Sequence, residues 1–144
     1  MRMSAHQSLA RHSATMARLK QAGLRPTRQR LDLAALLFNG HDRHITAEQL
    51  HEEAIGHSIK VSLATIYNTL NQFTEAGLLR EVVIEQGCSY FDTNTHDHHH
   101  FFFEDCGQLI DIPGDIIGLT TMPTPPSGMT IKRVDVVVRL SSAH

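Results

Sequence analysis

A run of histidines is the segment of this sequence that is best equipped for chemistry. Residues 96–100 read His-Asp-His-His-His, so four imidazoles and one carboxylate fall within five positions. Imidazole suits zinc, iron and related ions, and an added carboxylate favours harder ions such as iron(II) and manganese(II). Because the run is internal and β-forming residues flank it, it does not have the pattern of an expression tag. The run therefore predicts a specific metal site.

The geometry of a strand divides this run into two sets of side chains. Alternate side chains of a strand share a face. We therefore expect His96, His98 and His100 on one face of the strand, and Asp97 with His99 on the other. Two distinct groups of ligands follow from one short segment.

Two nearby carboxylates, Asp92 and Asp111, are candidates to complete a set of ligands around the run. The alternative is a surface polyhistidine patch that binds metals only opportunistically. The tight clustering and the neighbouring acids favour a specific site. Six lone histidines are interpreted as solvated or capping groups: His6, His12, His41, His51, His57 and His144.

Basic residues are concentrated at the start of the chain. Residues 1–30 hold seven of the 13 Lys and Arg residues and no acid, and all 15 Asp and Glu residues follow. Such an asymmetry indicates a polyanionic partner. On charge alone, an amphipathic helix that is merely solvated by its Lys and Arg residues explains the pattern equally well.

Four helices are predicted in the first half of the chain, over residues 8–21, 28–39, 47–55 and 63–76. Thr27 and Ser62 have the positions of N-caps, and Thr46 with Gln49 has the spacing of a capping box. Apolar residues recur at spacings of three and four. The third helix is expected to bury Ala47, Leu50, Ala54 and Ile55. The fourth is expected to bury Leu63, Ile66, Leu70 and Phe73.

A hairpin is predicted after these helices, with strands over 80–85 and 89–92 joined through Gln86 and Gly87. Helices followed by such a hairpin are typical of a winged helix. The fourth helix is then the one that enters the major groove, where hydroxyl and amide side chains read base edges. The candidate DNA contacts are Thr65, Tyr67 and Asn68 for the bases, and Lys20, Arg25, Arg28, Lys60 and Arg80 for the phosphates.

The C-terminal third of the chain is predicted to form a second, smaller lobe. Strands over 98–104 and 108–112 form a hairpin that Pro113 ends, about one helical turn occupies 115–119, and 131–140 is a final strand. So small a lobe has one apolar sheet face and little to cover it. A symmetric partner is the natural cover, so we expect a homodimer.

Several classes of protein are excluded by composition. No apolar run reaches the roughly 20 residues that a membrane span needs, and the N-terminus has no apolar signal core, so we expect a cytoplasmic protein with no membrane partner. The two cysteines, Cys88 and Cys106, form no Cys-x-x-Cys pair. Neither a disulfide framework nor a four-cysteine structural zinc site can therefore be built within one chain.

Three segments together resemble the ferric uptake regulator family. They are Leu-Arg-Pro-Thr-Arg-Gln-Arg at 24–30, Leu-Ala-Thr-Ile-Tyr at 63–67, and the histidine run with Asp-Cys-Gly at 105–107. The resemblance covers about residues 15–140. It implies an α/β (α+β) fold class, with an N-terminal winged helix-turn-helix domain over 1–93 and a small C-terminal α/β dimerisation domain over 94–144.

The resemblance also implies a regulatory metal at the hinge between the two domains. The family's hinge ligands fall on His44, Asp92, His98, His100 and Asp111. A second family site would use Asp97 and His99, but Gly118 stands where an acid is usual, so that site is incomplete. Phe103 replaces a cysteine of the family's structural zinc site and leaves Cys106 alone, so no structural zinc is expected.

The three phenylalanines at 101–103 and the Pro-Thr-Pro-Pro segment at 123–126 resemble the iron response regulator branch of the family. Members of that branch respond to haem, which implies haem contacts at His98, His99 and His100. We therefore expect a repressor of iron and haem homeostasis genes. Its partners would be a double-stranded DNA operator, a second copy of the chain and a haem-delivering protein.

Three alternatives remain at this stage. The first is a repressor of the same family that senses manganese, iron(II) or zinc through the five hinge ligands. The second is a metal-buffering protein, which would need the histidine run but no DNA-reading helix. The third is a small metalloenzyme, for which no separate nucleophile or general base stands out. We expect that the protein is not an enzyme.

Overall fold

The computed structural model describes residues 5–85 and 87–143, with side chains from His12 onward. The chain forms two compact units, of which the first ends at Thr95 and the second begins at His96. We call them the helical unit and the sheet unit. Gln86, which we assigned to the turn of the first hairpin, lies outside the described residues. Within the described part of the chain, no helix is long and apolar enough to cross a membrane.

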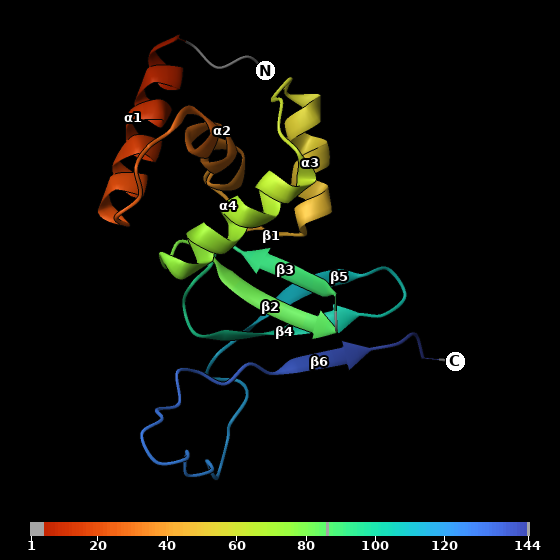
Figure 1. The fold of residues 1–144 in the computed structure, drawn as a ribbon. Helices are drawn as coiled ribbons and strands as arrows, with labels where there is room; N and C mark the ends of the chain where they lie inside the picture. The colour runs from red at the N-terminus through yellow and green to blue at the C-terminus, as the bar shows by residue number, and fades with distance from the viewer. Residues whose placement is uncertain (1–4, 86, 144) are drawn as a thin grey trace. The chain divides into compact units, whose positions relative to one another are not determined.

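The helical unit consists of four helices and a small antiparallel sheet (Figure 1). The sheet has the strand order β1-β3-β2. Its helices are α1 (Ala5–Gln21), α2 (Arg28–Leu37), α3 (Ala47–Gly56) and α4 (Leu63–Glu75), and its strands are β1 (His44–Ile45), β2 (Arg80–Glu85) and β3 (Cys88–Asp92). Helices followed by the β2–β3 hairpin give the winged helix that the sequence predicts.

Side chains fix the starts of three of these helices, as predicted. Thr27 accepts a hydrogen bond from the Arg30 backbone N–H at 3.3 Å, and Ser62 accepts one from Thr65 at 3.1 Å. Thr46 and Gln49 form both hydrogen bonds of a capping box. These caps satisfy backbone N–H groups that have no partner inside a helix. The sequence therefore sets where α2, α3 and α4 begin.

The core of the helical unit lies between the helices and β3. Its largest fully buried side chains include Leu19, Leu33, Leu37, Leu50, Ile66, Leu70, Phe73 and Phe91. Two details differ from the sequence prediction. Helix α2 ends at Leu37 rather than at 39, because Phe38 leaves the helical conformation and its ring lies 6.4 Å from that of Phe73. Ile55 is 59% exposed because it lies on the solvent side of α3.

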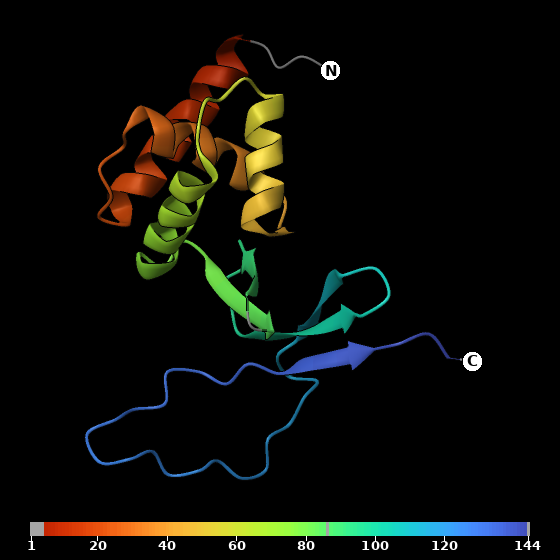
Figure 2. The same ribbon diagram turned by 45° about the vertical axis from the view of Figure 1, so that its right-hand side comes forward.

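The sheet unit is a three-stranded sheet with strand order β5-β4-β6. Its strands are β4 (His98–Phe103), β5 (Gln108–Pro113) and β6 (Val137–Leu140). Strands β4 and β5 form the predicted hairpin, and β6 runs parallel to β4. A long irregular loop joins β5 to β6 (Figure 2).

Strand β6 is shorter than the predicted strand over 131–140. The backbone N–H of Val136 donates to the Nδ1 of His99 at 3.1 Å, so a side chain replaces a backbone acceptor for this N–H just before β6 begins. The Val136 backbone oxygen still accepts from the His100 N–H at 3.1 Å. The helical turn predicted over 115–119 is also absent: the described residues of the sheet unit form turns and strands but no helix. The α+β class is confirmed for the chain, and its helices lie in the helical unit.

Candidate metal centre and nucleic-acid interface

His44 and Asp92 form a pair of candidate ligands in the helical unit. Strands β1 and β3 run antiparallel and place these two residues directly opposite each other. The Nε2 of His44 lies 3.1 Å from Oδ2 of Asp92, whose side chain is fully buried. Asp92 also accepts a hydrogen bond from the backbone N–H of Asn94 at 2.9 Å. We call these two residues the helical-unit pair.

His98, His100 and Asp111 form a second group, in the sheet unit. Alternation along β4 puts the two histidines on one face, and the β4–β5 register sets Asp111 opposite His100. The Nε2 atoms of His98 and His100 lie 3.4 and 3.3 Å from the same carboxylate oxygen, Oδ1 of Asp111. Ligand atoms of the three side chains lie within 4.8 Å of one another. We call them the sheet-unit triad.

The two imidazoles of the triad are held in place by their surroundings. His98 and His100 are 4% and 1% exposed, and their rings meet edge to face with centroids 4.5 Å apart. The Nδ1 of His98 contacts the backbone oxygen of His96 at 2.5 Å, which directs Nε2 toward Asp111. A ligand histidine is usually fixed in this way through its second nitrogen.

The donor set fits a small divalent ion better than haem. Imidazole nitrogens combined with carboxylate oxygens suit iron(II), manganese(II) and zinc. A haem needs an imidazole that reaches the flat face of a porphyrin. His98 and His100 are buried and packed edge to face, so neither imidazole is accessible to a porphyrin.

The rest of the histidine run lies differently from the prediction. His96 is exposed and precedes β4, so it does not share the strand face of His98 and His100. Asp97 is exposed as well, and His99 is half-buried with its Nδ1 accepting the Val136 N–H. Among the described residues, no group of three or more potential ligands includes Asp97 or His99.

Arg43 ties the helical-unit pair to helix α3. Its guanidinium donates to both carboxylate oxygens of Glu53, at 3.0 and 2.5 Å, and to the backbone oxygen of Leu36 at 2.9 Å. Its backbone N–H donates to Oγ1 of Thr93 at 2.9 Å, and its backbone oxygen accepts from the Thr93 N–H at 3.1 Å. Arg43 and Thr93 are the chain neighbours of His44 and Asp92. The Arg43 contacts therefore brace the strand ends that carry the pair.

Helix α4 presents the polar face that the sequence predicts. Asn68 is exposed, Tyr67 is 38% exposed, and Thr65 is half-buried with its hydroxyl 2.9 Å from that of Ser62. The phenol of Tyr67 donates a hydrogen bond of 2.6 Å to Oε1 of Glu48, in the first turn of α3. This hydrogen bond lowers the pKa of Glu48 and raises the pKa of Tyr67, because it stabilises the ionised carboxylate and the protonated phenol.

Most of the predicted phosphate contacts lie at the surface, but one does not. Lys20, Arg25 and Lys60 are exposed, and Arg28 is exposed beside Asp32 at 3.5 Å. Arg80 is only 4% exposed and pairs in register with Asp92 at the start of β2. Its charge is therefore directed into the unit, and the prediction that it neutralises a phosphate is wrong.

Sequence reasoning missed two contacts of this surface. Arg30 donates to the side-chain oxygen of Gln72 on α4 at 3.0 Å and to the backbone oxygen of Arg25 at 2.9 Å. Glu48 was not singled out, because no spacing rule relates an acid to a tyrosine 19 residues further along. The one sequence feature that marks Glu48 is its place as an acid in the first turn of a capped helix.

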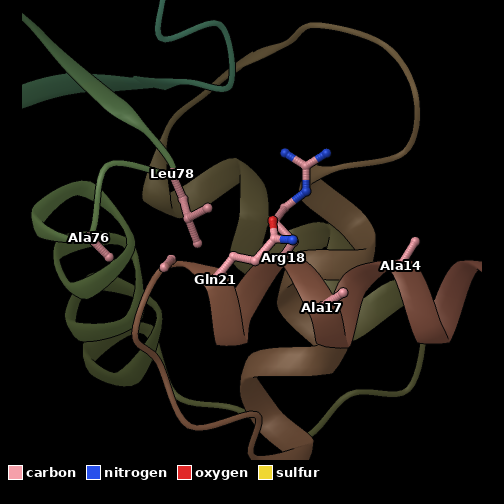
Figure 3. A pocket seen from close by; sticks show the side chains of 7 residues that line it. Ala14, Ala17, Arg18, Gln21, Ala76 and Leu78 are labelled. Carbon is pink, nitrogen blue, oxygen red and sulfur yellow. The ribbon is translucent and has the colours of Figure 1, made fainter.

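A groove lies between α1 and the end of α4 (Figure 3). Small and aliphatic side chains line it together with Arg18 and Gln21. The guanidinium of Arg18 lies 4.5 Å from the centre of the Phe38 ring, so this charge packs against the core of its own unit. The groove brings together no group of acids, histidines or thiols and is not a candidate catalytic site.

A sequence model of the ferric uptake regulator family matches residues 21–138, which is most of the chain. A ferric uptake regulation protein of Vibrio cholerae is 40% identical over 100 residues, which cover 69% of this chain and 67% of that protein. A peroxide-responsive repressor PerR of Staphylococcus aureus is 37% identical over 97 residues, which cover 67% of this chain and 65% of that protein. The match thus spans about two thirds of the length of these relatives.

The fold is also similar to solved structures. The crystal structure of the Vibrio cholerae ferric uptake regulator gives a TM-score of 0.68 at 28% sequence identity, over 88% of this chain and 98% of that one. The Pseudomonas aeruginosa ferric uptake regulator with manganese gives 0.66 at 23% identity, over 89% and 97% of the two chains. The second likeness concerns the fold alone.

Proposed function

The chain belongs to the ferric uptake regulator family, and from that membership we propose that it is a metal-responsive repressor that binds operator DNA as a homodimer. Members of this family are transcription regulators and not enzymes. The observation that carries the metal part of the proposal is the sheet-unit triad. Two buried imidazoles face one carboxylate oxygen there, and this set of donors supports binding of a metal ion.

We assign the regulatory ion to five ligands, namely His44, Asp92, His98, His100 and Asp111. The helical-unit pair and the sheet-unit triad each supply imidazole and carboxylate donors, and neither alone fills the coordination shell of manganese(II) or iron(II). An ion shared by the two would stabilise the arrangement of units in which both reach it. The ion shifts DNA affinity only to the extent that it binds this arrangement more tightly than others.

The choice of a divalent ion is supported by similar proteins, although they do not specify its ligands in this chain. The Vibrio cholerae structure is described as revealing a structural rearrangement of its DNA-binding domains. The Pseudomonas aeruginosa regulator was solved with manganese, and a similar manganese uptake regulator was solved bound to zinc. The mixed nitrogen and oxygen donors here favour manganese(II) or iron(II), with zinc as a competitor.

DNA reading is assigned to α4 and to the basic residues at the surface of the helical unit. Thr65, Tyr67 and Asn68 would face base edges, while Lys20, Arg25, Arg28 and Lys60 would contact phosphates. A second copy of the chain would present a second α4 to the next half-site. Exposed apolar residues of the sheet unit, including Ile110, Ile116 and Met129, support association with a second copy. The proposal implies a cytoplasmic protein, because its partner is operator DNA.

Haem is the second candidate effector, as the resemblance to the iron response regulator branch implies. His99 is the candidate contact, because this imidazole is half-buried rather than buried. Its Nδ1 lone pair accepts the Val136 N–H, so this hydrogen bond would have to break before the neutral imidazole could hold the haem iron. His98 and His100 would contribute only after their packing opens. We therefore place haem below a divalent ion, and a haem-delivering partner depends on this candidate. A metal-buffering role is disfavoured by the capped α4 and its polar face.

The proposal is tested by measuring DNA binding with and without effector. The probe is an operator duplex selected by the wild-type protein from a library with a randomised centre, in the presence of manganese(II). Manganese(II) should change the affinity of the wild-type protein for this duplex by about fivefold or more. His100→Ala and Asp111→Asn should lose that response. His57→Ala removes an exposed imidazole from the end of α3 and should keep it.

Each outcome decides one part of the proposal. If no sequence is enriched, DNA reading by this chain is wrong. If a sequence is enriched but manganese(II), iron(II) and zinc all leave its affinity unchanged, metal regulation is wrong. A response to haem alone, lost in His99→Ala and retained in His100→Ala, would replace the divalent ion by haem.

A further inference from the structure

One hydrogen bond joins the DNA-reading helix to the helix that precedes it. The phenol of Tyr67 on α4 donates to the carboxylate of Glu48 in the first turn of α3, at an O–O distance of 2.6 Å. We propose that Glu48 is a specificity-determining residue, which positions the Tyr67 ring for reading DNA and disfavours binding to other sequences. This inference rests on the proposed DNA-reading role of α4.

The contact has the features of a strong constraint on the ring. A phenol that donates to a carboxylate at this distance makes a charge-assisted hydrogen bond, which is stronger than one between neutral groups. Tyr67 is 38% exposed, so packing alone leaves part of the residue without contact. The hydrogen bond therefore restrains an exposed aromatic side chain that has only two side-chain torsions to fix.

The acceptor itself sits on a rigid part of the fold. Glu48 lies two residues after Thr46, and the capping box of Thr46 and Gln49 fixes the first turn of α3 around it. The N-terminal end of a helix also stabilises a carboxylate. The hydrogen bond to Tyr67 lowers the pKa of Glu48, so the acceptor remains ionised at neutral pH. Tyr67 is thus held by a group that is itself fixed in place and charged.

The charge of Glu48 has a second consequence for DNA binding. A carboxylate beside the reading helix repels phosphates, and this repulsion acts on every DNA sequence alike. A positioned Tyr67 ring gains contacts only where the base edge or thymine methyl fits it. The charge of Glu48 therefore weakens binding to every DNA sequence, and its hydrogen bond to Tyr67 offsets this loss only at matching sequences. The quantity it controls is the ratio of operator affinity to non-operator affinity.

This proposal makes a different prediction from a purely structural role. If Glu48 served only to stabilise α3, its replacement would weaken operator and non-operator binding together, through loss of folded protein. If it positions Tyr67, Glu48→Gln should leave non-operator binding unchanged or tighter and should weaken operator binding. The matched control is Glu52→Gln, which removes an exposed acid from the same helix.

The test compares wild type, Glu48→Gln, Tyr67→Phe, the double variant and Glu52→Gln on two duplexes. One is the operator selected by the wild-type protein, and the other has the same base composition in shuffled order. We expect the affinity ratio to fall about tenfold in each single variant, as for loss of one charged hydrogen bond. The double variant should fall no further than Tyr67→Phe alone, because Tyr67→Phe already removes the hydrogen bond whose charge Glu48→Gln removes. Glu52→Gln should keep the wild-type ratio.

A second measurement reports on the contact without any DNA. The chain has two tyrosines and no tryptophan, so ultraviolet absorbance follows tyrosine ionisation cleanly. The difference between wild type and Tyr67→Phe isolates Tyr67, whose pKa is raised by the hydrogen bond to Glu48. In Glu48→Gln that pKa should fall toward its ordinary value, whereas in Glu52→Gln it should not move.

The two measurements separate failure of this inference from failure of the proposed function. If the library yields no operator, the proposed function fails, and the titration still shows whether the contact exists. If an operator is found and the titration shows the contact, but the affinity ratio of Glu48→Gln equals that of wild type, the role of Glu48 is overturned. An unchanged Tyr67 pKa in Glu48→Gln overturns it as well.

Discussion

Arg43 and Glu53 form a bidentate ion pair. Nη1 of Arg43 lies 3.0 Å from Oε1 of Glu53, and Nη2 lies 2.5 Å from Oε2. This geometry is specific to arginine, because lysine offers a single ammonium group. The pair joins the residue before His44 to helix α3. A proposed metal ligand is therefore anchored to the same helix that contacts Tyr67.

Breaking this ion pair should lower the free energy of unfolding of the protein. Arg43→Met should lower the free energy of unfolding by about 1 kcal/mol, since the two side chains are 24% and 36% exposed and are only partly screened. Urea unfolding measures this change. The matched control is Arg28→Met, whose 90% exposed side chain pairs with Asp32, and it should change stability by less than about 0.5 kcal/mol. Equal effects of the two substitutions would show that the Arg43 pair braces nothing.

Removing His44 should separate a divalent-ion sensor from a haem sensor. His44→Ala removes the imidazole that faces Asp92, so affinity for manganese(II) should fall by roughly 100-fold or more, measured by competition with a chelating dye. Operator binding should then no longer respond to manganese(II). The neighbouring exposed His41→Ala is the control. A protein that keeps its full response without His44 would exclude this residue from the regulatory site.

Two glycines of the sheet unit should respond oppositely to alanine. A Cβ on Gly114 would lie 2.8 Å from the backbone oxygen of Asp97, so the chain next to His98 must shift. We expect a loss of roughly 1–3 kcal/mol and weaker metal binding. A Cβ on Gly118 meets nothing within 4 Å, and Gly118→Ala should leave stability unchanged or raise it by up to about 1 kcal/mol. Similar thermal midpoints for the two variants would contradict the tight approach at Gly114.

The contribution of the N-cap of α4 to stability should be measurable by itself. Ser62→Ala removes the acceptor of the Thr65 N–H and should lower the free energy of unfolding by about 1 kcal/mol. Ser62→Gly should cost only a few tenths of a kcal/mol, because glycine leaves the N-terminal groups open to water. Urea titration of the two variants checks this order. Equal losses would mean that the hydroxyl is not the cap.

The Tyr67–Glu48 contact should give stability a defined pH window. Glu48 has a lowered pKa, so its contribution is present above the ordinary pKa of glutamate and is lost as the pH falls through the lowered value. Tyr67 has a raised pKa, chiefly from the hydrogen bond to Glu48, with burial, the Glu48 charge and Cys88 adding to it. Its contribution is present below about pH 10 and is lost as the pH rises through the raised value.

Unfolding of wild type and Tyr67→Phe across pH tests this window. The stability difference between them should be constant through the neutral range and should shrink at both ends. A difference that does not vary at either end would show that the contact does not form in solution.

Local patterns predicted much of the fold. The caps at Thr27, Thr46 and Ser62 define helix starts because they depend on residues three positions apart. Features set by distant contacts were beyond such rules. Strand β1 has two residues, too few to show a periodicity. The predicted strand over 131–140 begins too early, because the sequence does not reveal that the Val136 N–H bonds to the His99 side chain. Arg80 looked like a surface cation because its burial depends on the packing of β2.

The candidate site divides along the same line. Strand alternation alone puts His98 and His100 on one face, and the hairpin register then brings Asp111 to them. His44 was reached only through resemblance to a family, because an isolated histidine carries no spacing signal. Alternation also misplaced His96, since the strand begins two residues later.

Helix α3 makes its two acidic contacts from opposite ends, with Glu48 in its first turn and Glu53 near its last. A local unfolding of this single helix would therefore release Tyr67 and the strand that carries His44 in one event. Amide hydrogen exchange within α3 would then measure how often the protein loses, at the same moment, the two proposed capacities to read DNA and to hold an ion.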